Sequence, residues 1–250
     1  MKFGSKKAKP HAASLAHDRS AILREDSPFA AQEAYKTLRT NIMFSIPAGG
    51  CKVIGLTSSV ASEGKSTNCI NLAITFAETG ARVLLVDCDL RRPNIARLLG
   101  CRATAGLSNV LAGLVEADAA IQKTGYPSLD VMASGGLSPN PTELLDSEEM
   151  GKLLKAQAEK YDYIFLDTPP VNLVSDALIL SKYLTGILFV VRQNHSEKGL
   201  IKDAVRQLEF AGVKVLGFIL NDVREARQGR YRYRYNYYGG YGYAGEARDD

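Results

Sequence analysis

Two kinds of apolar pattern alternate along the middle of the chain. In one, apolar residues follow one another with little interruption, which is typical of strands buried on both faces of a sheet. These runs lie at 51–59, 82–89, 128–133, 161–167, 186–192 and 213–220. In the other, apolar positions recur every three or four residues, which is typical of helices. These stretches lie at 29–44, 68–77, 95–100, 147–160, 176–183 and 196–211. The alternation predicts an α/β domain with a mainly parallel sheet covered by helices on both faces.

Local signals add detail to this prediction. Ser27 and Pro28 resemble the N-cap and first-turn proline of the helix at 29–44. We expect residues 106–125 to form helix and turn, and the segment from Gly135 to Pro141 to form a loop. Inward-facing positions are predicted at Ala34, Leu38, Ile42 and Met43 of the first helix, and at Met150, Leu153, Leu154 and Ala158 of the helix at 147–160.

A phosphate-binding loop is predicted between the first strand and the helix at 68–77. Its core, Gly64-Lys65-Ser66, matches the end of the pattern G-x-x-x-x-G-K-[ST]. In such loops backbone N–H groups and a helix N-terminus face an anion, the lysine reaches the β/γ-phosphates and the hydroxyl holds Mg²⁺. The pattern asks for glycine at position 59, where this chain has a serine, a small residue that still permits a turn. The predicted ATP contacts here are Ser62, Glu63, Gly64, Lys65, Ser66 and Thr67.

Carboxylates follow two of the apolar runs, with Asp87 and Asp89 after one and Asp167 after another. Ligands in this architecture lie beyond the carboxyl ends of the strands, where these side chains would meet Lys65. Buried carboxylates need compensation, and a bound Mg²⁺ would supply it. The predicted catalytic residues are Lys65, Asp87, Asp89 and Asp167, and the predicted metal ligands are Ser66, Asp87, Asp89 and Asp167. Lys65 would neutralise phosphate charge, and either Asp87 or Asp89 would accept a proton from an attacking hydroxyl. A strand-end aspartate also often caps the next helix, which leaves a second interpretation open for each.

Composition is that of a globular protein, with 46% hydrophobic and 23% charged residues in a chain of 250. The net charge of +4 is concentrated near the two ends, which favours interacting tails over a basic binding face. The four cysteines form no C-x-x-C pair, and no run approaches the ~20 apolar residues that span a bilayer. We therefore expect a cytoplasmic protein with a flexible basic arm at 1–27, a phosphate-loop domain at 28–222 and a disordered tail at 223–250.

Two motifs resemble those of the bacterial tyrosine kinases (BY-kinases) of capsule and exopolysaccharide assembly. The sequence Val86-Asp87-Cys88-Asp89-Leu90-Arg91 resembles their second Walker motif, and the run from Ile164 to Pro170 resembles their Walker B motif. With the phosphate loop, the similarity extends over residues 28–222. It implies a stand-alone kinase with a P-loop NTPase-like fold that transfers phosphate from ATP, with Mg²⁺, to protein tyrosine. Asn221 and Asp222, after the last strand, would lie near the adenine or merely end the strand.

The resemblance also implies partners. The family's ring-forming motif E-x-x-R-x-x-R is approximated by Glu33, Lys36 and Arg39, although lysine cannot make the bidentate contacts of arginine. A homo-oligomeric ring is therefore expected. Because no membrane-spanning run is present, the resemblance indicates a separate membrane-anchored activator that recruits the kinase to the inner face of the membrane. A cognate phosphotyrosine phosphatase is the third expected partner.

The C-terminal tail carries a cluster of tyrosines between glycines and arginines: Tyr231, Tyr233, Tyr235, Tyr237, Tyr238, Tyr241 and Tyr243. By the same resemblance, one subunit presents these phosphoacceptors to the active site of its neighbour. Each phosphate would add about −1.5 to −2 charges to a segment that contains four arginines, Arg227, Arg230, Arg232 and Arg234. A few phosphates would reverse the charge of the tail and loosen its contact with the neighbour.

Two other functions compete with this interpretation. A partition- or division-site-type ATPase switch has a related architecture, but its loop carries an early lysine where this chain has Val60. A nucleic-acid-binding protein would use the Arg/Tyr/Gly tail to stack on bases and to neutralise phosphates. The folded part has no comparable basic stripe, so no nucleic-acid partner is expected.

Overall fold

In the part of the chain that the structure describes, seven strands form a single sheet with the order β3-β4-β2-β5-β1-β6-β7. The strands are β1 (Lys52–Ser58), β2 (Val83–Asp87), β3 (Ile121–Lys123), β4 (Leu129–Met132), β5 (Tyr163–Asp167), β6 (Gly186–Arg192) and β7 (Val215–Asn221). Every neighbouring pair is parallel except β3 and β4, which are antiparallel. The computed structural model describes residues 19–223. Within them, the predicted mainly parallel α/β sheet is confirmed.

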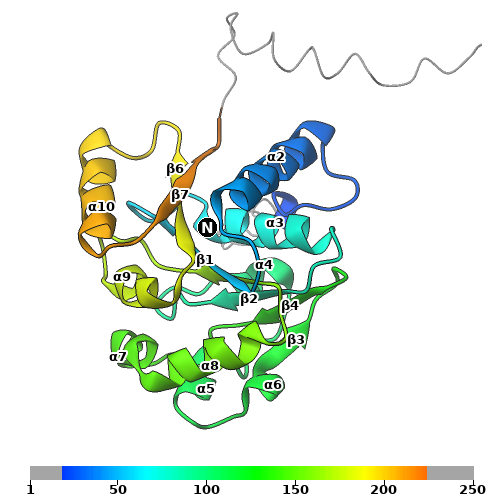
Figure 1. Cartoon of the computed structure of the whole chain (residues 1–250), viewed down its shortest axis with the longest axis vertical. Coiled ribbons are helices and arrows are strands. Elements are labelled where there is room, and N and C mark those ends of the chain that lie inside the picture. Colours follow the sequence, from blue (N-terminus) through cyan, green and yellow to red (C-terminus); the bar gives the residue numbers. More distant parts are fainter. Residues whose placement is uncertain (1–18, 224–250) are drawn as a thin grey trace, which may run out of the picture.

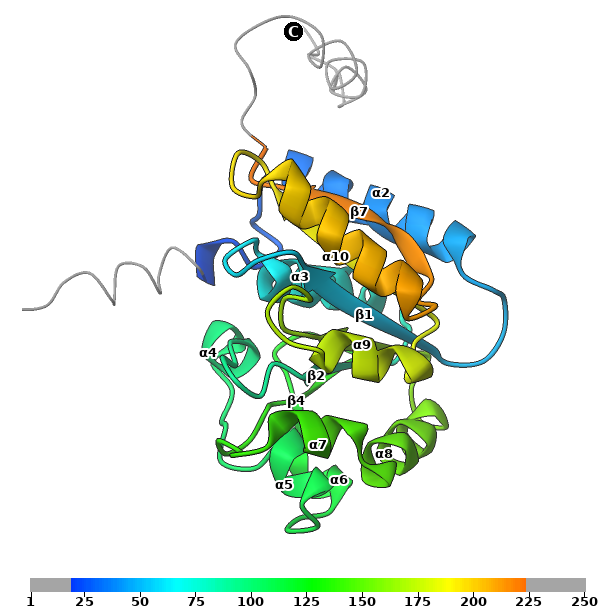
Figure 2. The ribbon, with the colours of Figure 1, turned by 90° about the vertical axis from the view of Figure 1, so that its left-hand side faces the viewer.

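Helices cover both faces of the sheet (Figures 1 and 2). The helices are α2 (Phe29–Ser45), α3 (Lys65–Ala77), α4 (Ile95–Leu99), α5 (Leu107–Leu111), α6 (Ala117–Ala120), α7 (Pro141–Asp146), α8 (Glu148–Ala158), α9 (Asp176–Leu180) and α10 (Lys198–Phe210), with a 3₁₀ turn at Ser181–Tyr183. Helices α2, α3 and α4 pack on one face, and α5 to α10 pack on the other. Among residues 19–223, none of these helices is long and apolar enough to cross a membrane.

The core consists of two apolar layers, one on each face of the sheet. Alternate residues of β1 point to opposite layers, so that Ile54 packs toward α3 while Val53 packs toward α8. The ring of Phe76 on α3 lies 4.5 Å from the ring of Tyr163 and 5.2 Å from that of Phe165. Because both faces are covered, the central strands are apolar throughout, which explains why the sequence shows continuous runs there rather than alternation.

Two short elements were not predicted. The segment expected to be helix and turn contains β3, an edge strand of three residues, which is too short to produce an apolar pattern. The segment expected to be loop ends at α7, which begins at Pro141 in the first-turn position that proline favours. The proline was therefore a helix-start signal.

Three predictions at helix positions were wrong. The hydroxyl of Ser27 accepts a hydrogen bond from the backbone N–H of Arg24 (2.9 Å), and Pro28 itself is the N-cap residue of α2. Met43 is 50% exposed, and Ile42 is the residue of α2 that is buried. In α8 the inward position falls on Gln157, while Ala158 is partly exposed.

Part of the predicted N-terminal arm packs against the domain. Ile22 and Leu23 are buried in the layer that contains α3. The side chain of Asn71 on α3 accepts a hydrogen bond from the N–H of Leu23 (2.8 Å) and donates one to the carbonyl of Ala21 (2.9 Å). The hydroxyl of Tyr126 donates to the carbonyl of Leu23 (2.9 Å). The packed domain thus includes residues that precede 28, and residues 1–18 lie outside the described part.

Candidate active site

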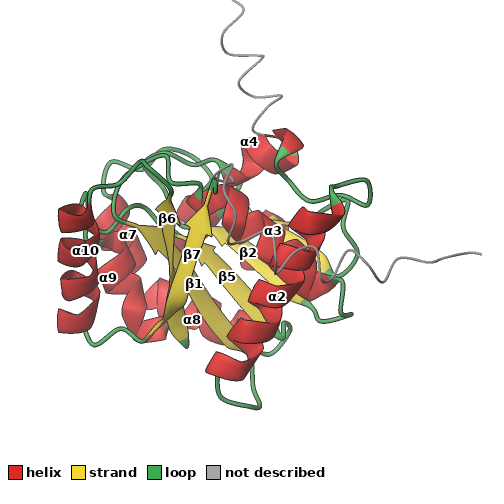
Figure 3. Ribbon diagram, turned by 90° about the horizontal axis from the view of Figure 1, so that it is seen from above, coloured by secondary structure: helices red, strands yellow, loops and turns green. Residues whose placement is uncertain are grey.

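The predicted site residues meet at the carboxyl ends of the parallel strands. In Figure 3 the arrowheads of β6 and β7 point toward the loops on the same side of the molecule as α4. Asp87 at the end of β2 is paired in register with Asp167 at the end of β5, and Leu56 of β1 pairs with Asp167 from the other side. The three strands therefore deliver the phosphate loop and the carboxylates to one edge of the sheet.

The phosphate loop requires glycine where it enters α3. Gly64 is the N-cap residue of α3 and has φ +89°, and a Cβ there would lie 2.1 Å from Nδ2 of Asn221. The backbone N–H and the side-chain amide of Asn68 both donate to the carbonyl of Gly64 (3.0 and 2.9 Å). The helix thus begins at Lys65, three residues before the predicted start, and its N-terminus lies directly behind the loop.

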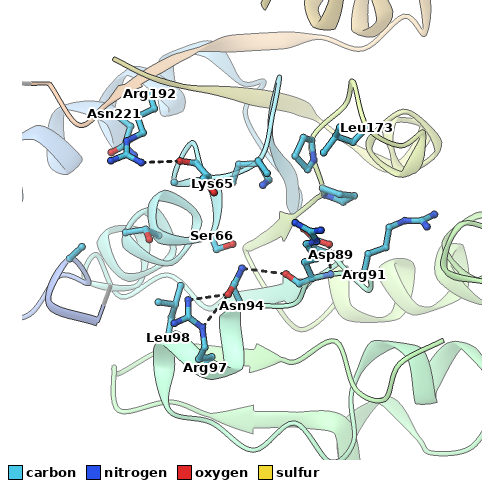
Figure 4. Close-up of a pocket in the computed structure, with 18 of the residues that line it drawn as sticks. Lys65, Ser66, Asp89, Arg91, Asn94, Arg97, Leu98, Leu173, Arg192 and Asn221 are labelled. Atoms are coloured by element: carbon cyan, nitrogen blue, oxygen red, sulfur yellow. Dashed lines mark hydrogen bonds between the residues drawn. The ribbon is translucent and has the colours of Figure 1, made fainter. Parts of the chain in front are cut away.

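A cleft of about 850 Å³ opens above this loop (Figure 4). Most of the predicted ATP contacts line it, namely Ser62, Gly64, Lys65, Ser66, Thr67 and Asn221. Asp89 and Asp222 line it too, and further lining comes from residues that were not singled out as ligands: Arg92, Asn94, Arg97, Leu98, Pro169, Pro170, Leu173, Val174 and Arg192. These residues lie at or after the ends of β2, β5 and β6, which is the signal that could have indicated them.

Glu63 is the exception among the predicted contacts of the loop. Its side chain is fully buried and does not line the cleft. Its carboxylate accepts hydrogen bonds from the backbone N–H groups of Ser59 (2.8 Å) and Val60 (3.1 Å). The carboxylate therefore faces the interior of the protein, and the carbonyl of Glu63 accepts a hydrogen bond from the side chain of Asn221 (2.9 Å).

Among the carboxylates of the site, Asp167 gives the clearest indication of a bound cation. It is completely buried, and within the described residues neither of its carboxylate oxygens has a hydrogen-bond partner. Desolvation raises its pKa to about 6, although the nearby Lys65 ammonium and Ser66 hydroxyl act in the opposite direction. A buried carboxylate without donors is costly, and a cation bound beside it would remove that cost.

The two aspartates that follow β2 occupy different positions. Asp87 is buried and accepts hydrogen bonds from the backbone N–H groups of Asn94 (3.1 Å) and Ile95 (3.0 Å) at the start of α4. Its pKa is held well above the usual range of an aspartate, mainly because the carboxyl group is buried and also because the charge of Asp167 repels it. Asp89 lines the cleft, and its carboxylate accepts a hydrogen bond from the N–H of Arg92 (2.9 Å). The helix-capping interpretation therefore applies to Asp87, while Asp89 faces the ligand space.

The predicted metal ligands do not form a closed cluster. Among residues 19–223, no group of three His, Cys, Asp or Glu side chains is arranged to hold a metal ion. Mg²⁺ in nucleotide sites is usually held by one or two carboxylates together with phosphate oxygens and water. The residues that fit such a site are Ser66 and Asp167, because Asp167 has two free buried oxygens and Ser66 is beside it.

Arg91 points away from the phosphate loop (Figure 4). Its guanidinium donates to the buried carboxylate of Asp176 at the start of α9 (3.1 Å) and to the hydroxyl of Thr142 on α7 (2.6 Å). The hydroxyl of Thr142 in turn donates to Asp176 (2.8 Å). This network fastens the loop that carries Asp89 to two helices. Asp176 and Thr142 were missed because their role depends on contacts between distant segments.

The candidate ring residues on α2 have different surroundings. Lys36 forms an ion pair with Glu33 (2.8 Å), and both side chains stay about two-fifths exposed. The guanidinium of Arg39 instead donates to the carbonyl of Thr75 in the last turn of α3 (2.5 Å). Glu33 and Lys36 thus remain accessible, while Arg39 contacts its own chain. The tail tyrosines from Tyr231 to Tyr243 lie outside the described residues.

Comparison with known proteins agrees with this geometry. A parallel sheet with a phosphate loop before α3 and carboxylates after β2 and β5 defines a nucleotide-binding protein of the P-loop class. Residues 51–209 match the family model described as an AAA domain. The chain is 36% identical to tyrosine-protein kinase YwqD of Bacillus subtilis, over 86% of this chain and 91% of that protein. It is also 36% identical to tyrosine-protein kinase CpsD of Streptococcus agalactiae, over 84% of this chain and 90% of that protein.

Solved structures give the same result. The chimerical protein CapA2B2 superposes with a TM-score of 0.77 at 34% identity, covering 82% of this chain and 91% of that one. The kinase domain of the Escherichia coli tyrosine kinase ETK has a TM-score of 0.76 at 33% identity, covering 80% and 79%. The septum site-determining protein MinD of Pyrococcus horikoshii, complexed with Mg-ADP, has a TM-score of 0.61 at 27% identity, covering 71% and 72%. The chain belongs to the bacterial tyrosine-protein kinase family, and it is a protein-tyrosine kinase. The predicted resemblance is confirmed, and the division-site proteins share its fold.

Proposed function

We propose that the cleft binds ATP with Mg²⁺ and transfers the γ-phosphoryl group to tyrosines in the C-terminal cluster of a neighbouring copy. The observation that carries this proposal is the buried carboxylate of Asp167, whose two oxygens lack donors within the described residues and lie beside Lys65 and Ser66. That arrangement suits a divalent cation next to a phosphate loop. The Mg-ADP complex of the related division-site protein supports the same cofactor.

Different side chains of the site would neutralise the phosphates, hold the metal ion and contact the base. Lys65, almost fully buried at the first position of α3, neutralises charge on the β/γ-phosphates. Ser66 and Asp167 would hold a magnesium ion, which would supply further neutralisation of the developing charge. Asn221 contacts the base at the far side of the loop, where its side chain donates to the carbonyl of Glu63 (2.9 Å). These contacts leave the Asp89 side of the cleft for the acceptor.

Asp89 is the residue that we assign as general base. It lines the cleft, whereas the carboxylate of Asp87 is engaged by the start of α4. Desolvation raises the pKa of Asp89, which makes it a better proton acceptor. The tyrosine oxygen forms a bond to the γ-phosphorus, the bond to the β–γ bridging oxygen breaks with release of ADP, and the phenolic proton passes to Asp89.

The assembly follows from the same proposal. The acceptor tyrosines are Tyr231, Tyr233, Tyr235, Tyr237, Tyr238, Tyr241 and Tyr243, and a ring of copies formed partly through Glu33 and Lys36 presents them in trans. A membrane-anchored activator recruits the ring to the inner face of the membrane, and a phosphotyrosine phosphatase resets it. Cycling between the two states regulates capsule or exopolysaccharide synthesis and export.

Mass spectrometry of the full chain incubated with Mg-ATP tests the activity. We expect phosphotyrosine in the tail, with or without an added membrane activator. Lys65→Met should abolish the label, while the matched change Lys152→Met on the exposed face of α8 should leave it unchanged. Replacement of all seven tail tyrosines by phenylalanine should abolish self-labelling and preserve ATP binding. Intact ATP hydrolysis without phosphotyrosine under both conditions would contradict the proposal.

A further inference from the structure

The buried carboxylate of Glu63 joins two separate segments of the chain. One of its oxygens, Oε2, accepts hydrogen bonds from the N–H and the hydroxyl of Ser59 (2.8 and 3.0 Å) and from the N–H of Val60 (3.1 Å). The other, Oε1, accepts from the N–H of Arg192 (3.3 Å) and from the hydroxyl of Ser196. The first set lies at the entrance of the phosphate loop, and the second consists of the last residue of β6 and a residue of the connection from β6 to α10.

These donors compensate a charge that would otherwise be expensive to bury. Glu63 is 0% exposed, so its carboxylate has no water to replace a lost partner. Hydrogen bonds to an ionised acceptor are about twice as strong as neutral ones, and an unpaired buried charge is strongly destabilising. The conformation of the loop entrance and the position of the β6–α10 connection are therefore coupled through one side chain.

Two further contacts also connect the phosphate loop to residues near the carboxyl ends of β6 and β7. The ring of His195 lies 3.0 Å from the carbonyl of Ala61, and the amide of Asn221 donates to the carbonyl of Glu63 (2.9 Å). Residues at and just after the ends of β6 and β7 thus contact the loop, and two of them, Arg192 and Asn221, also line the cleft. The loop also departs from the common pattern, because position 59 is a serine whose hydroxyl is itself a donor to Glu63.

We propose that Glu63 is a positioning residue that holds the phosphate-binding loop in its nucleotide-binding shape and fastens it to the β6–α10 connection without touching the nucleotide. This inference rests on the proposed nucleotide-binding function of the cleft. A glutamine at this position has the same size, but its amide group would face N–H donors on one side. Glu63→Gln therefore disrupts one of the two sets of contacts while it changes neither the cleft lining nor the side-chain volume.

Calorimetric titration of the full chain with Mg-ADP tests the proposal. Glu63→Gln should weaken binding by about tenfold or more, as expected for lost hydrogen bonds to a charged group, and should raise KM for ATP more than it lowers kcat. Ser196→Ala, which removes one Oε1 partner outside the cleft lining, should weaken binding about threefold. In the double variant the loss should be smaller than the product of the two, because both act through the same carboxylate. Glu78→Gln, on the exposed end of α3, is the matched control and should bind as the wild type does.

The experiment distinguishes a failure of the inference about Glu63 from a failure of the proposed function. If the wild-type chain binds Mg-ADP and Glu63→Gln binds within twofold of it while only the melting temperature falls, the role of Glu63 is merely structural and the inference is overturned. Independent effects of Glu63→Gln and Ser196→Ala, multiplying in the double variant, would overturn the coupling between the two segments. If the wild-type chain itself does not bind Mg-ADP, the proposed function fails and the inference falls with it.

Discussion

At the scale of single residues, the site contains buried carboxylates that are compensated to different degrees. Asp167 is buried without hydrogen-bond donors among the described residues, whereas Asp87 and Glu63 have backbone N–H groups to compensate them. Lys65 lies near Asp167 but reduces its pKa shift only in part. The three carboxylates therefore differ in how far hydrogen bonds compensate their buried charge, and Asp167 is the one that a cation would stabilise most.

Asp167→Asn is expected to stabilise the protein when nucleotide and Mg²⁺ are absent. The pKa of Asp167 is raised to about 6 in the folded protein, against about 3.9 in an unfolded chain. A raised carboxyl pKa favours the protonated folded form, so the wild-type free energy of unfolding falls as the pH rises between these values and then stays constant. The asparagine variant avoids this loss, which corresponds to about 3 kcal/mol at pH 8 and about half of that at pH 5.

Urea denaturation at the two pH values measures this difference. The variant should also lose phosphotyrosine formation and the stabilisation that Mg-ADP gives to the wild type. Equal stability of the two proteins at pH 8 would show that Asp167 is already compensated within the chain, and the assignment of a cation to it would then lose its physical basis.

At the scale of elements, the apolar patterns predicted the sheet and most of its helices because burial on both faces leaves a strong signal in each strand. They do not predict β3 because it is a three-residue edge strand, and they do not predict α7 because its first residue, Pro141, also ends the expected loop from Gly135. The phosphate loop and the strand-end carboxylates were predictable because their spacing follows from one architecture. The roles of Asp176 and of the buried side chain of Glu63 were not, because both depend on partners far away in the sequence.

The N-terminal segment packed on α3 offers a test at this scale. Asn71→Ala removes the acceptor for the N–H of Leu23 and the donor for the carbonyl of Ala21. Because the buried N–H of Leu23 would lose its partner, while the carbonyl of the exposed Ala21 could turn to water, we expect the free energy of unfolding to fall by about 2 kcal/mol. Asn41→Ala on the exposed side of α2 should change it by less than about 0.5 kcal/mol. Chemical denaturation of the three proteins checks this, and a loss no larger than that of the control would mean that the segment does not contribute to the stability of the domain.

At the scale of the whole molecule, the described domain holds the proposed catalytic half of the reaction and the C-terminal segment holds the proposed acceptors. The cleft is open above the phosphate loop, and Asp89 faces this open space. The accessible pair of Glu33 and Lys36 lies on α2, on the face of the sheet that α3 also covers. Under the proposed function, a second copy would supply only the tyrosine, because the residues proposed to bind Mg-ATP and to accept the proton all belong to the described domain.

Transfer between copies is the central claim, and a mixing experiment tests it most directly. One partner is the Lys65→Met chain with its tail tyrosines intact, and the other is an active chain whose seven tail tyrosines are phenylalanine. Neither should label itself with Mg-ATP. Mixed together, they should give phosphotyrosine in the tail of the Lys65→Met chain, at a rate that rises with protein concentration. No label on the Lys65→Met chain, under conditions in which the wild type labels itself, would contradict the account.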